Sequence, residues 1–352
     1  MSLTQINIHN LRNIKQLKLS FNPRFNIFHG VNGSGKTSLL EAIYLLSNGR
    51  SFRSREIEPI LRFNEDMLTV FAKLGKEDAI SIQKTKAGST IVKLNHQSCK
   101  RASDLARFLP CQVIYQDIFQ IIDAGPAIRR NVLDWGLFHQ DKGYNKLLTA
   151  LKQILKQRGA LLRQKSPAVN FKPWDNLLVD ISLEIDKIRG AYFKELTLVF
   201  QMILAKLTNT ACNINYYRGW DKKGSGLGLT DILREQLESD IRRQYTNSGA
   251  HQADILFDSI ELKAKSTLSR GQQKIILIAL KLAQSYLLAD ECVYLFDDVA
   301  SELDRNHLGR LLDLLQEIKG QFFFTAIDPQ QLLFHTSLNQ AMLFPLDSLH
   351  NL

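Results

Sequence analysis

The stretch "GVNGSGKT", residues 30–37, constrains the fold of this chain more than any other segment. It fits the phosphate-loop pattern G-x-x-x-x-G-K-[ST], with strand-like "FNIFH" before it and helix-like "SLLEAIYLL" after it. Glycines let backbone amides surround a β-phosphate, Lys36 places its charge on the β- and γ-phosphates, and the Thr37 hydroxyl binds Mg²⁺. We therefore expect a nucleoside triphosphate site formed by Gly30, Val31, Asn32, Gly33, Ser34, Gly35, Lys36, Thr37 and Ser38.

The stretch "VYLFDD", residues 293–298, predicts the partner of that loop. Four apolar residues indicate a buried strand, and two carboxylates follow at its carboxyl end, where α/β sheets hold their ligands. We expect Asp297 to hold Mg²⁺, directly or through water, and Asp298 to orient or deprotonate an attacking water. An apolar strand that ends in aspartate is common by itself, so the phosphate loop carries most of the weight.

A second motif, "LSRGQ", begins an apolar helix far along the chain from the phosphate loop. The amino end of a helix suits an anion, because its free N–H groups and its dipole both point there. A second copy of the chain could bring Ser269 and the Gly271 amide to a γ-phosphate across a twofold interface. The structural alternative is a capping box, in which Ser269 caps the helix and Gln272 lies three residues later.

The middle of the chain differs from both ends. Apolar residues recur at steps of three and four over residues 147–162 and again over 174–207, with "KSPAVNFKP" between them. This pattern predicts two long helices in an antiparallel hairpin, either a short arm or an ordinary packed subdomain. Strand-like segments before it and alternating strands and helices after it predict one α/β head from residues 1–107 and 246–352. The inserted, mainly helical lobe spans residues 108–245.

Charge and cysteine content bear on partners and compartment. Lys plus Arg number 45 against 35 Asp plus Glu, for a formal net charge of +10. That balance favours a polyanion, either nucleic acid or an acidic membrane surface, although a merely basic protein is the plain alternative. Four scattered cysteines lack metal-ligand spacing, and no apolar run is long enough for a signal peptide or membrane span. We therefore expect a cytoplasmic protein with reduced thiols and no membrane partner.

Several motifs together, in this order, resemble one superfamily. They are "LRNIK", "GVNGSGKTSLLEAI", "GRSFR", "GPAIRRNVLDW", "HQAD", "TLSRGQQK" and "FDDVASELD". The chain resembles the ABC-type ATPases of the SMC/Rad50 superfamily over nearly its whole length, and within them the RecF family of recombination mediators. The resemblance implies an α/β fold, namely an ABC-type ATPase head with a β-rich N-terminal part. The helical lobe, or short antiparallel coiled-coil arm, is then inserted into that head.

The resemblance also implies an activity. Members are weak DNA-dependent ATPases that bind DNA as ATP-bound homodimers and release it on slow hydrolysis. They grip double-stranded DNA near a single-strand gap and help RecA to load, together with RecO and RecR, in recombinational repair, replication restart and SOS induction. The signature and D-loop residues would meet the other subunit's ATP, whereas Arg12 and Asn13 would meet their own. Those signature and D-loop residues are Ser269, Arg270, Gly271, Gln272, Ser301 and Asp304.

Some positions depart from the wider superfamily. Its second acidic residue is usually Glu, whereas Asp298 is one methylene shorter, which predicts slow hydrolysis. The switch histidine of ABC transporters is replaced by "TA" at residues 325–326. Gln116 is a candidate for the Q-loop glutamine, with a plain loop residue equally open. Gln252 in "HQAD" stands where the RecF pattern often has Arg, which leaves no role assigned to it.

DNA contacts are predicted from basic clusters. Arg50, Arg53 and Arg55, with Phe52 among them, follow the phosphate-loop helix and can meet DNA phosphates between closed heads. A solvated basic loop is the structural alternative. The pair at residues 129–130 either contacts DNA or pairs with acidic groups in the core.

Other classes of protein fit these motifs less well. An ABC transporter subunit predicts a switch histidine, and a long-armed chromosomal tether needs arms of hundreds of residues. A metabolic phosphate-loop kinase needs neither "LSRGQ" nor "SELD". An ABC-type subunit whose closed dimer engages a protein instead of DNA is kept as the alternative.

Overall fold

The computed structural model describes residues 2–99, 102–259, 262–263 and 268–347. The chain divides into two compact units. The first unit comprises Met1–Ile118, Lys206–Thr208 and Leu288–Leu352, and the second comprises Phe119–Ala205 and Asn209–Leu287. Residues 246–287 thus cluster with the mainly helical segment, whereas the sequence pattern predicts that they belong to the head. The predicted domain boundaries at 107/108 and 245/246 stay a prediction about domain organisation.

A five-stranded parallel sheet forms the centre of the first unit, in the order β14-β3-β13-β12-β8. Its strands are near-continuous apolar runs, because a parallel sheet is covered on both faces. The register pairs Phe296 with Phe324 and Ala326 with His29, so the strands end at one edge. The strands are β3 (Phe25–His29), β8 (Cys111–Ile114), β12 (Cys292–Phe296), β13 (Gly320–Ala326) and β14 (Met342–Pro345).

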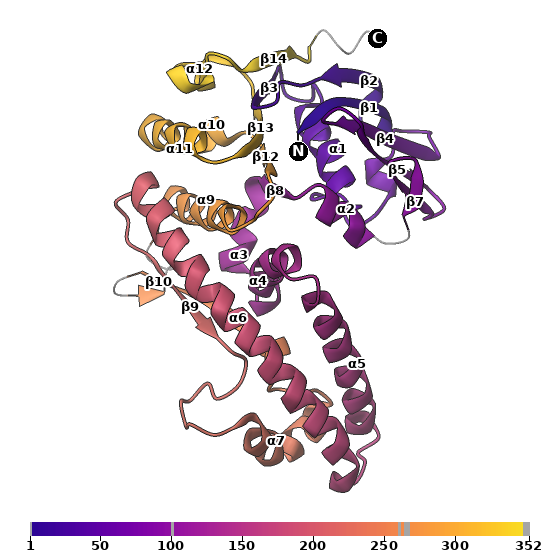
Figure 1. Ribbon diagram of the computed structural model, residues 1–352, viewed down its shortest axis with the longest axis vertical. Coiled ribbons are helices and arrows are strands. Elements are labelled where there is room, and N and C mark those ends of the chain that lie inside the picture. Colours follow the sequence, from indigo (N-terminus) through magenta and orange to yellow (C-terminus); the bar gives the residue numbers. More distant parts are fainter. Residues whose placement is uncertain (1, 100–101, 260–261, 264–267, 348–352) are drawn as a thin grey trace. The chain divides into compact units, whose positions relative to one another are not determined.

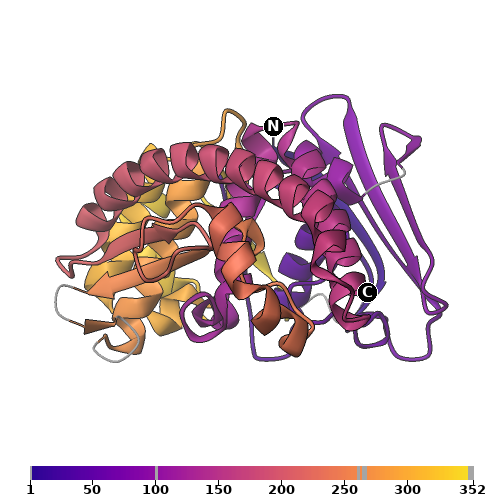
Figure 2. The same cartoon turned by 90° about the horizontal axis from the view of Figure 1, so that it is seen from below.

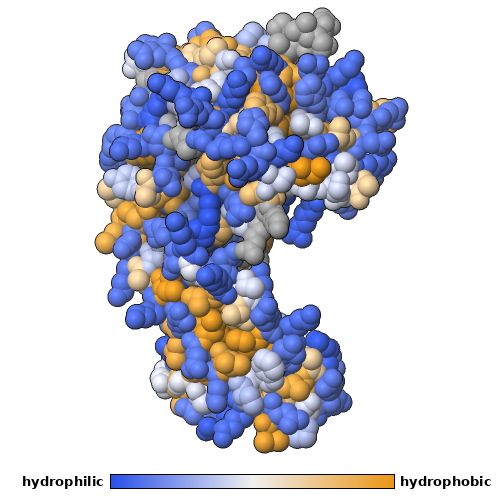
Figure 3. Space-filling model, turned by 45° about the vertical axis from the view of Figure 1, so that its right-hand side comes forward, coloured by the Kyte–Doolittle hydropathy of each residue, from blue (hydrophilic) through white to orange (hydrophobic). Residues whose placement is uncertain are grey.

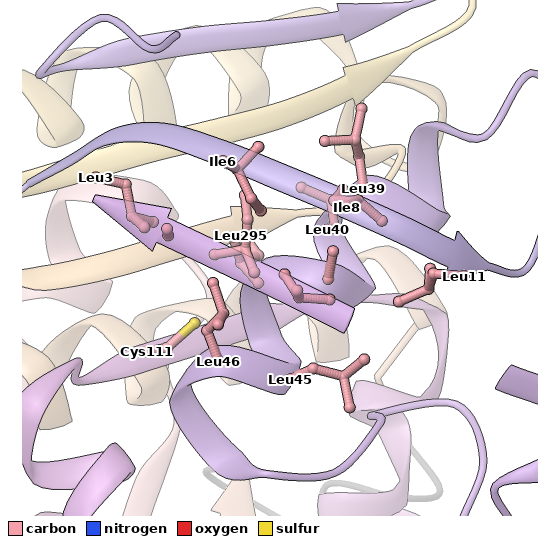
Figure 4. Close-up of a cluster of buried hydrophobic side chains, with 14 of the residues drawn as sticks. Leu3, Ile6, Ile8, Leu11, Leu39, Leu40, Leu45, Leu46, Cys111 and Leu295 are labelled. Atoms are coloured by element: carbon pink, nitrogen blue, oxygen red, sulfur yellow. The ribbon is translucent and has the colours of Figure 1, made fainter. Parts of the chain in front are cut away.

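A six-stranded antiparallel sheet, in the order β2-β1-β4-β5-β6-β7, makes the rest of the β-structure in this unit. The predicted β-rich N-terminal part is therefore confirmed. Alternating residues of β1 (Leu3–Leu11) and β4 (Met67–Leu74) are buried, and they pack with α1 (Lys36–Asn48) into one apolar core (Figure 4). The other strands are β2 (Ile14–Ser20), β5 (Asp78–Thr85), β6 (Thr90–Leu94) and β7 (Gln97–Cys99).

Short helices complete the first unit. The α-helices are α2 (Ala102–Phe108), α10 (Val299–Glu302), α11 (Arg305–Glu317) and α12 (Gln330–Leu333). The 3₁₀ turns are η1 (Glu58–Ile60), η2 (Gln116–Phe119) and η5 (Thr336–Leu338). Gln321 of β13 is buried and bonds both backbone groups of Leu3, which joins the two sheets of the unit.

The second unit is mainly helical, as the apolar periodicity predicts. Helix α5 (Tyr144–Arg163) and helix α6 (Lys172–Leu207) form the expected antiparallel pair, with Pro167 and a 3₁₀ turn η3 (Ala168–Phe171) between them (Figure 1). Helix α6 has 36 residues, and Figure 2 shows it as one unbroken ribbon that curves along its length. The remaining helical elements are α3 (Gln120–Asp123), α4 (Pro126–Gln140), α7 (Leu229–Arg243), η4 (Ala250–Gln252) and α9 (Arg270–Tyr286). A three-stranded sheet contains β9 (Asn213–Tyr217), β10 (Asp254–Ser259) and β11 (Leu262–Lys263).

Two buried arginines cross-link these helices. Arg158 of α5 donates to Asp175 of α6 and to Asp240 of α7, each at 2.8 Å. Arg189 of α6 donates to the Tyr144 hydroxyl and to Asp134, also at 2.8 Å each. Both guanidinium groups are almost fully buried, so their ion pairs replace the water that each charge loses.

Close packing of α4 against α6 leads to a first prediction. A Cβ atom at Gly136 would lie 2.0 Å from the Tyr192 hydroxyl, within the buried interior, so Gly136→Ala forces either the Tyr192 ring or the helices themselves to shift. We expect a loss of about 1–3 kcal/mol in the free energy of unfolding, as for other overpacked cores. The matched control is Gly190→Ala in α6, where a Cβ meets no atom within 4 Å. Urea unfolding should show the control at least as stable as the unchanged chain; equal losses would contradict the packing argument.

Helix length and surface hydropathy describe the outside of the molecule. Among the described residues, no helix is both long and apolar enough to cross a bilayer. In Figure 3, hydrophilic side chains cover much of the visible face, and apolar side chains gather over the helical second unit in the lower half of the view.

Candidate nucleotide-binding site

The phosphate loop lies between the carboxyl end of β3 and the start of α1. Gly33 and Gly35 have φ values of 86° and 94°, which a residue with a side chain rarely adopts. Gly35 stands directly before α1 and gives it no side-chain cap, so no N-cap side chain occupies the first-turn amides of α1. Such amides are ready donors for a phosphate group.

Lys36 is held by its own loop. Its Nζ donates to the carbonyl oxygens of Gly30, at 2.6 Å, and Val31, at 2.8 Å. Burial lowers the pKa of Lys36, while the charges of Asp298, Asp347 and Asp297 act against that effect. An ammonium group has three donors, so one remains for a phosphate oxygen after these two contacts.

Thr37 and Asp297, far apart in the sequence, meet as predicted. The Thr37 hydroxyl donates to the Asp297 carboxylate at 2.9 Å. The hydroxyl of Thr325, at the end of β13, also donates to Asp297 at 2.9 Å, and burial raises the pKa of this carboxyl. Hydroxyl and carboxylate oxygens are the hard ligands that Mg²⁺ accepts, with phosphate and water completing its shell. The donor set therefore fits the predicted metal.

Asp298 follows in a strained position. Its φ is 53°, in the left-handed region, and its amide donates to Thr325 at 2.7 Å. One carboxylate oxygen of Asp298 is buried, and no described residue of the chain bonds it. Strain and an unsatisfied acceptor concentrate at functional positions, and this oxygen is one that can accept a proton from water.

These groups line a cavity of about 600 Å³ in the first unit. Most of the predicted nucleotide-site residues of that unit line it: Arg12, Asn13, Asn32, Gly33, Gly35, Lys36, Thr37, Ser38, Gln116, Asp297 and Asp298. Six further residues, for which no motif predicts a nucleotide role, also line the cavity: Arg53, Pro59, Leu61, Glu302, Thr325 and Ile327. The sequence signal at Thr325 is only the replacement of a histidine, and the turn at residues 57–61 carries no motif.

The turn after β1 supports the cavity wall. Both oxygens of the buried Glu41 accept from Arg12 at 2.8 Å, and Glu41 also contacts Ser51. Asn13 donates to the Gly33 carbonyl at 2.9 Å and accepts from Ser38 at 3.0 Å. Arg12 is thus engaged by Glu41, and its predicted contact with nucleotide stays a prediction.

The D-loop residues have structural contacts of their own. Ser301 donates to the Asp298 carbonyl at 2.9 Å, and Asp304 caps α11 by accepting from two backbone amides. Hydrogen bonds from the His307 backbone and side chain lower the pKa of Asp304. Neither residue lines the cavity, and their role at a dimer interface stays a prediction.

The signature motif lies in the second unit. The predicted capping box of α9 is present, since Ser269 accepts from the Gln272 amide while Gln272 accepts from the Ser269 amide. Arg270 pairs with Asp123 at 2.8 Å and lies over the Phe119 ring. Thr267, the first residue of the stretch "TLSRGQQK", lies outside the described part of the chain. The anion-binding role of Ser269, Arg270, Gly271 and Gln272 stays a prediction.

The three arginines predicted to contact DNA lie in different environments. Arg50, Arg53 and Arg55 are exposed, but Arg53 lines the nucleotide cavity and its charge lowers the pKa of Asp297 against the larger effect of burial. Phe52 is half-buried between the rings of Tyr44 and Tyr115, so it is a packing residue.

The arginine pair at residues 129–130 makes contacts within the second unit, and Arg129 pairs with an acidic group there. Arg129 forms a bidentate pair with Asp254, at 2.6 and 2.9 Å, and Arg130 donates to the Ala253 carbonyl at 2.9 Å. These contacts use the guanidinium groups within the second unit.

Comparison with known proteins gives a consistent picture. The model of the RecF/RecN/SMC N-terminal domain family matches residues 2–343. The DNA replication and repair protein RecF of Pseudomonas syringae pv. syringae (strain B728a) is 37% identical over 340 residues, which cover 94% of this chain and 92% of the relative. RecF of Pseudomonas aeruginosa (strain UCBPP-PA14) is 38% identical over 342 residues, with the same coverage.

Solved structures agree with the sequence relatives. The recombination mediator protein RecF with ATP, of the RecFOR pathway, superposes with a TM-score of 0.81 at 27% identity, over 94% of each chain. An Smc head bound to the C-winged helix domain of ScpA superposes with a TM-score of 0.59 at 17% identity, over 95% of this chain and 91% of that one. The second similarity concerns the fold alone, and both confirm the predicted α/β ATPase-head architecture.

Proposed function

We propose, from the premise that this chain belongs to the RecF/RecN/SMC N-terminal domain family, that it is an ATP-dependent DNA-binding clamp. In this proposal an ATP-bound homodimer holds double-stranded or gapped DNA, and slow ATP hydrolysis releases it. The carrying observation is the 2.9 Å contact of the Thr37 hydroxyl with Asp297, beside Lys36. It joins the two halves of a nucleotide site that lie on separate strands of one parallel sheet.

The residues around the cavity suggest how ATP is held. Amides of the phosphate loop and Lys36 bind the phosphates, and Thr37 and Asp297 hold Mg²⁺, which neutralises charge on the β- and γ-phosphates when bound. One oxygen of Asp298 is bonded by no residue in the described part of the chain, and we propose that it orients a water or takes its proton. Because its side chain is one methylene shorter than Glu, we propose that it holds this water less closely and that turnover is slow.

The signature motif supports a homodimer. Ser269 and the Gly271 amide belong to a helix start in the second unit, whereas the phosphate loop belongs to the first. We propose that Ser269, Arg270, Gly271 and Gln272 contact the γ-phosphate held by another copy, with Ser301 and Asp304 at the same interface. The capping box does not prevent this role, since a capped helix start still offers free amides.

The biological setting is carried over from the relatives. They are named as DNA replication and repair proteins, and the ATP-bound structure belongs to a RecFOR pathway. We propose that this chain acts in the cytoplasm with RecO and RecR to help RecA load at single-strand gaps, in recombinational repair, replication restart and SOS induction. Arg50 and Arg55, exposed and outside the cavity lining, are the proposed DNA contacts. Because Arg53 lines the cavity, we propose that it contacts a phosphate group of either the nucleotide or the DNA.

Fluorescence anisotropy of a labelled gapped duplex tests the clamp. We expect Mg²⁺ with ATP to tighten DNA binding relative to ADP by roughly tenfold, the factor that about 1.4 kcal/mol of coupling gives. Ser269→Arg should abolish this gain, because its side chain fills the position of the partner's γ-phosphate. It should keep the weak, salt-sensitive binding that basic residues provide. The matched control is Ser225→Arg, an exposed residue of the second unit.

Two outcomes would change the proposal. Loss of the ATP effect in Ser225→Arg as well would show that added charge, and not the signature motif, is responsible. Binding that ignores the nucleotide in all variants would favour the alternative, in which the closed dimer engages a protein. The next experiment would then be a pull-down of protein partners with this chain kept in its ATP-bound form, in place of the DNA titration.

A further inference from the structure

A carboxylate from the far end of the chain lies against the phosphate loop. Strand β14 lies beside β3 (Figure 1). The two strands pair in parallel, with Pro345 opposite His29, and the Leu346 amide donates to the His29 carbonyl. This pairing carries the chain past the end of β3, where the next residue is Asp347. One oxygen of Asp347 accepts a hydrogen bond of 2.8 Å from the Val31 amide.

The same peptide group is held from its other side by Lys36. The peptide bond between Gly30 and Val31 contains the Gly30 carbonyl, which accepts from Lys36 Nζ at 2.6 Å. Its N–H is the donor to Asp347. Hydrogen bonds in such a chain polarise one another, so a carboxylate at the N–H end makes the carbonyl a better acceptor for the ammonium group. The charge of Asp347 also acts on Lys36, opposing the effect of burial on its pKa.

Gly30 is required for this close approach. Its φ is 147°, a region that favours glycine, and a Cβ atom there would lie 2.6 Å from the Asp347 oxygen. Asp347 itself is exposed, so its removal leaves no buried cavity. The contact therefore concerns the shape of the loop and not the stability of the core.

We propose that Asp347 is a positioning residue of the nucleotide site, which fixes the Gly30–Val31 peptide and through it the ammonium group of Lys36. The proposal rests on the proposed function, because it concerns how the same loop binds the phosphates of ATP. It gives the C-terminal strand β14 a role in nucleotide affinity that no motif in the sequence indicates.

Titration calorimetry with Mg²⁺ and ATP tests the proposal on the full chain. We expect Asp347→Ala to weaken ATP binding by roughly tenfold, the factor for one lost charge-assisted hydrogen bond of about 1.4 kcal/mol. Asp347→Asn keeps an acceptor oxygen and should stay within about threefold of the unchanged chain. The control Asp313→Ala removes an equal charge from an exposed site on α11 and should leave affinity unchanged. The thermal unfolding temperature without nucleotide should be the same in all of them.

The outcomes distinguish failure of the positioning role of Asp347 from failure of the proposed ATP-binding function. If Asp347→Ala binds ATP as the unchanged chain does, or if Asp347→Asn is as weak as Asp347→Ala, the positioning role is wrong. If the unchanged chain and Lys36→Ala both fail to bind ATP, the proposed function itself fails. A double-mutant cycle adds a second readout: Gly30→Ala should cost less affinity in the Asp347→Ala background, because the steric conflict is gone there.

Discussion

Asp298→Asn is expected to lower ATP turnover by at least about a hundredfold, the usual contribution of a positioned general base, while ATP affinity stays within about threefold. The physical reason is that Asp298 lines the cavity together with Lys36 and Thr37, and that no described residue of the chain bonds one of its carboxylate oxygens. Asparagine is close in size but its amide cannot take a proton. ATP-promoted DNA binding should therefore persist in this variant and last longer.

Two measurements check this prediction together. Phosphate release gives the turnover, and the dissociation rate of a labelled duplex after dilution into excess competitor gives the lifetime of the complex. Asp290→Asn, an exposed residue before β12, is the matched control and should change neither. Unchanged turnover in Asp298→Asn would remove Asp298 from the mechanism and direct attention to Glu302, the other carboxylate that lines the cavity beside Asp297.

The second large effect concerns stability of the helical unit. Arg158→Met is expected to lower the free energy of unfolding by about 3–5 kcal/mol, because it leaves Asp240 as an uncompensated buried charge. Asp240 and Arg158 are both fully buried, and Thr246 also loses a donor at 2.8 Å. Unfolding in urea, followed by circular dichroism, measures the loss.

Two further variants show whether the charge is responsible. Arg242→Met removes an exposed arginine that pairs loosely with Glu238 on the same helix, and it should leave stability unchanged. Adding Asp240→Leu to Arg158→Met should recover part of the loss, because the buried charge is then gone. A double variant less stable than Arg158→Met alone would argue that packing, and not the unpaired charge, dominates at this site.

Much of the site was predictable because its parts are local patterns. The glycines of the phosphate loop, the two carboxylates after β12 and the capping box of α9 each depend on residues a few positions apart. Local hydrogen bonding and backbone conformation decide such features, so residue types and their spacing are enough to predict them. The same holds for α5 and α6, whose apolar faces follow the helical repeat.

The amino-acid sequence by itself thus determined the type of head, the phosphate loop and its carboxylate partner, and the long helical pair. Only the tertiary structure decided where Asp347, Arg53 and Phe52 lie. Asp347 reaches Val31 because β14 pairs with β3, across 316 positions of the chain. Pairing of distant strands depends on burial and register over the whole sheet, and no local pattern around Asp347 carries that information.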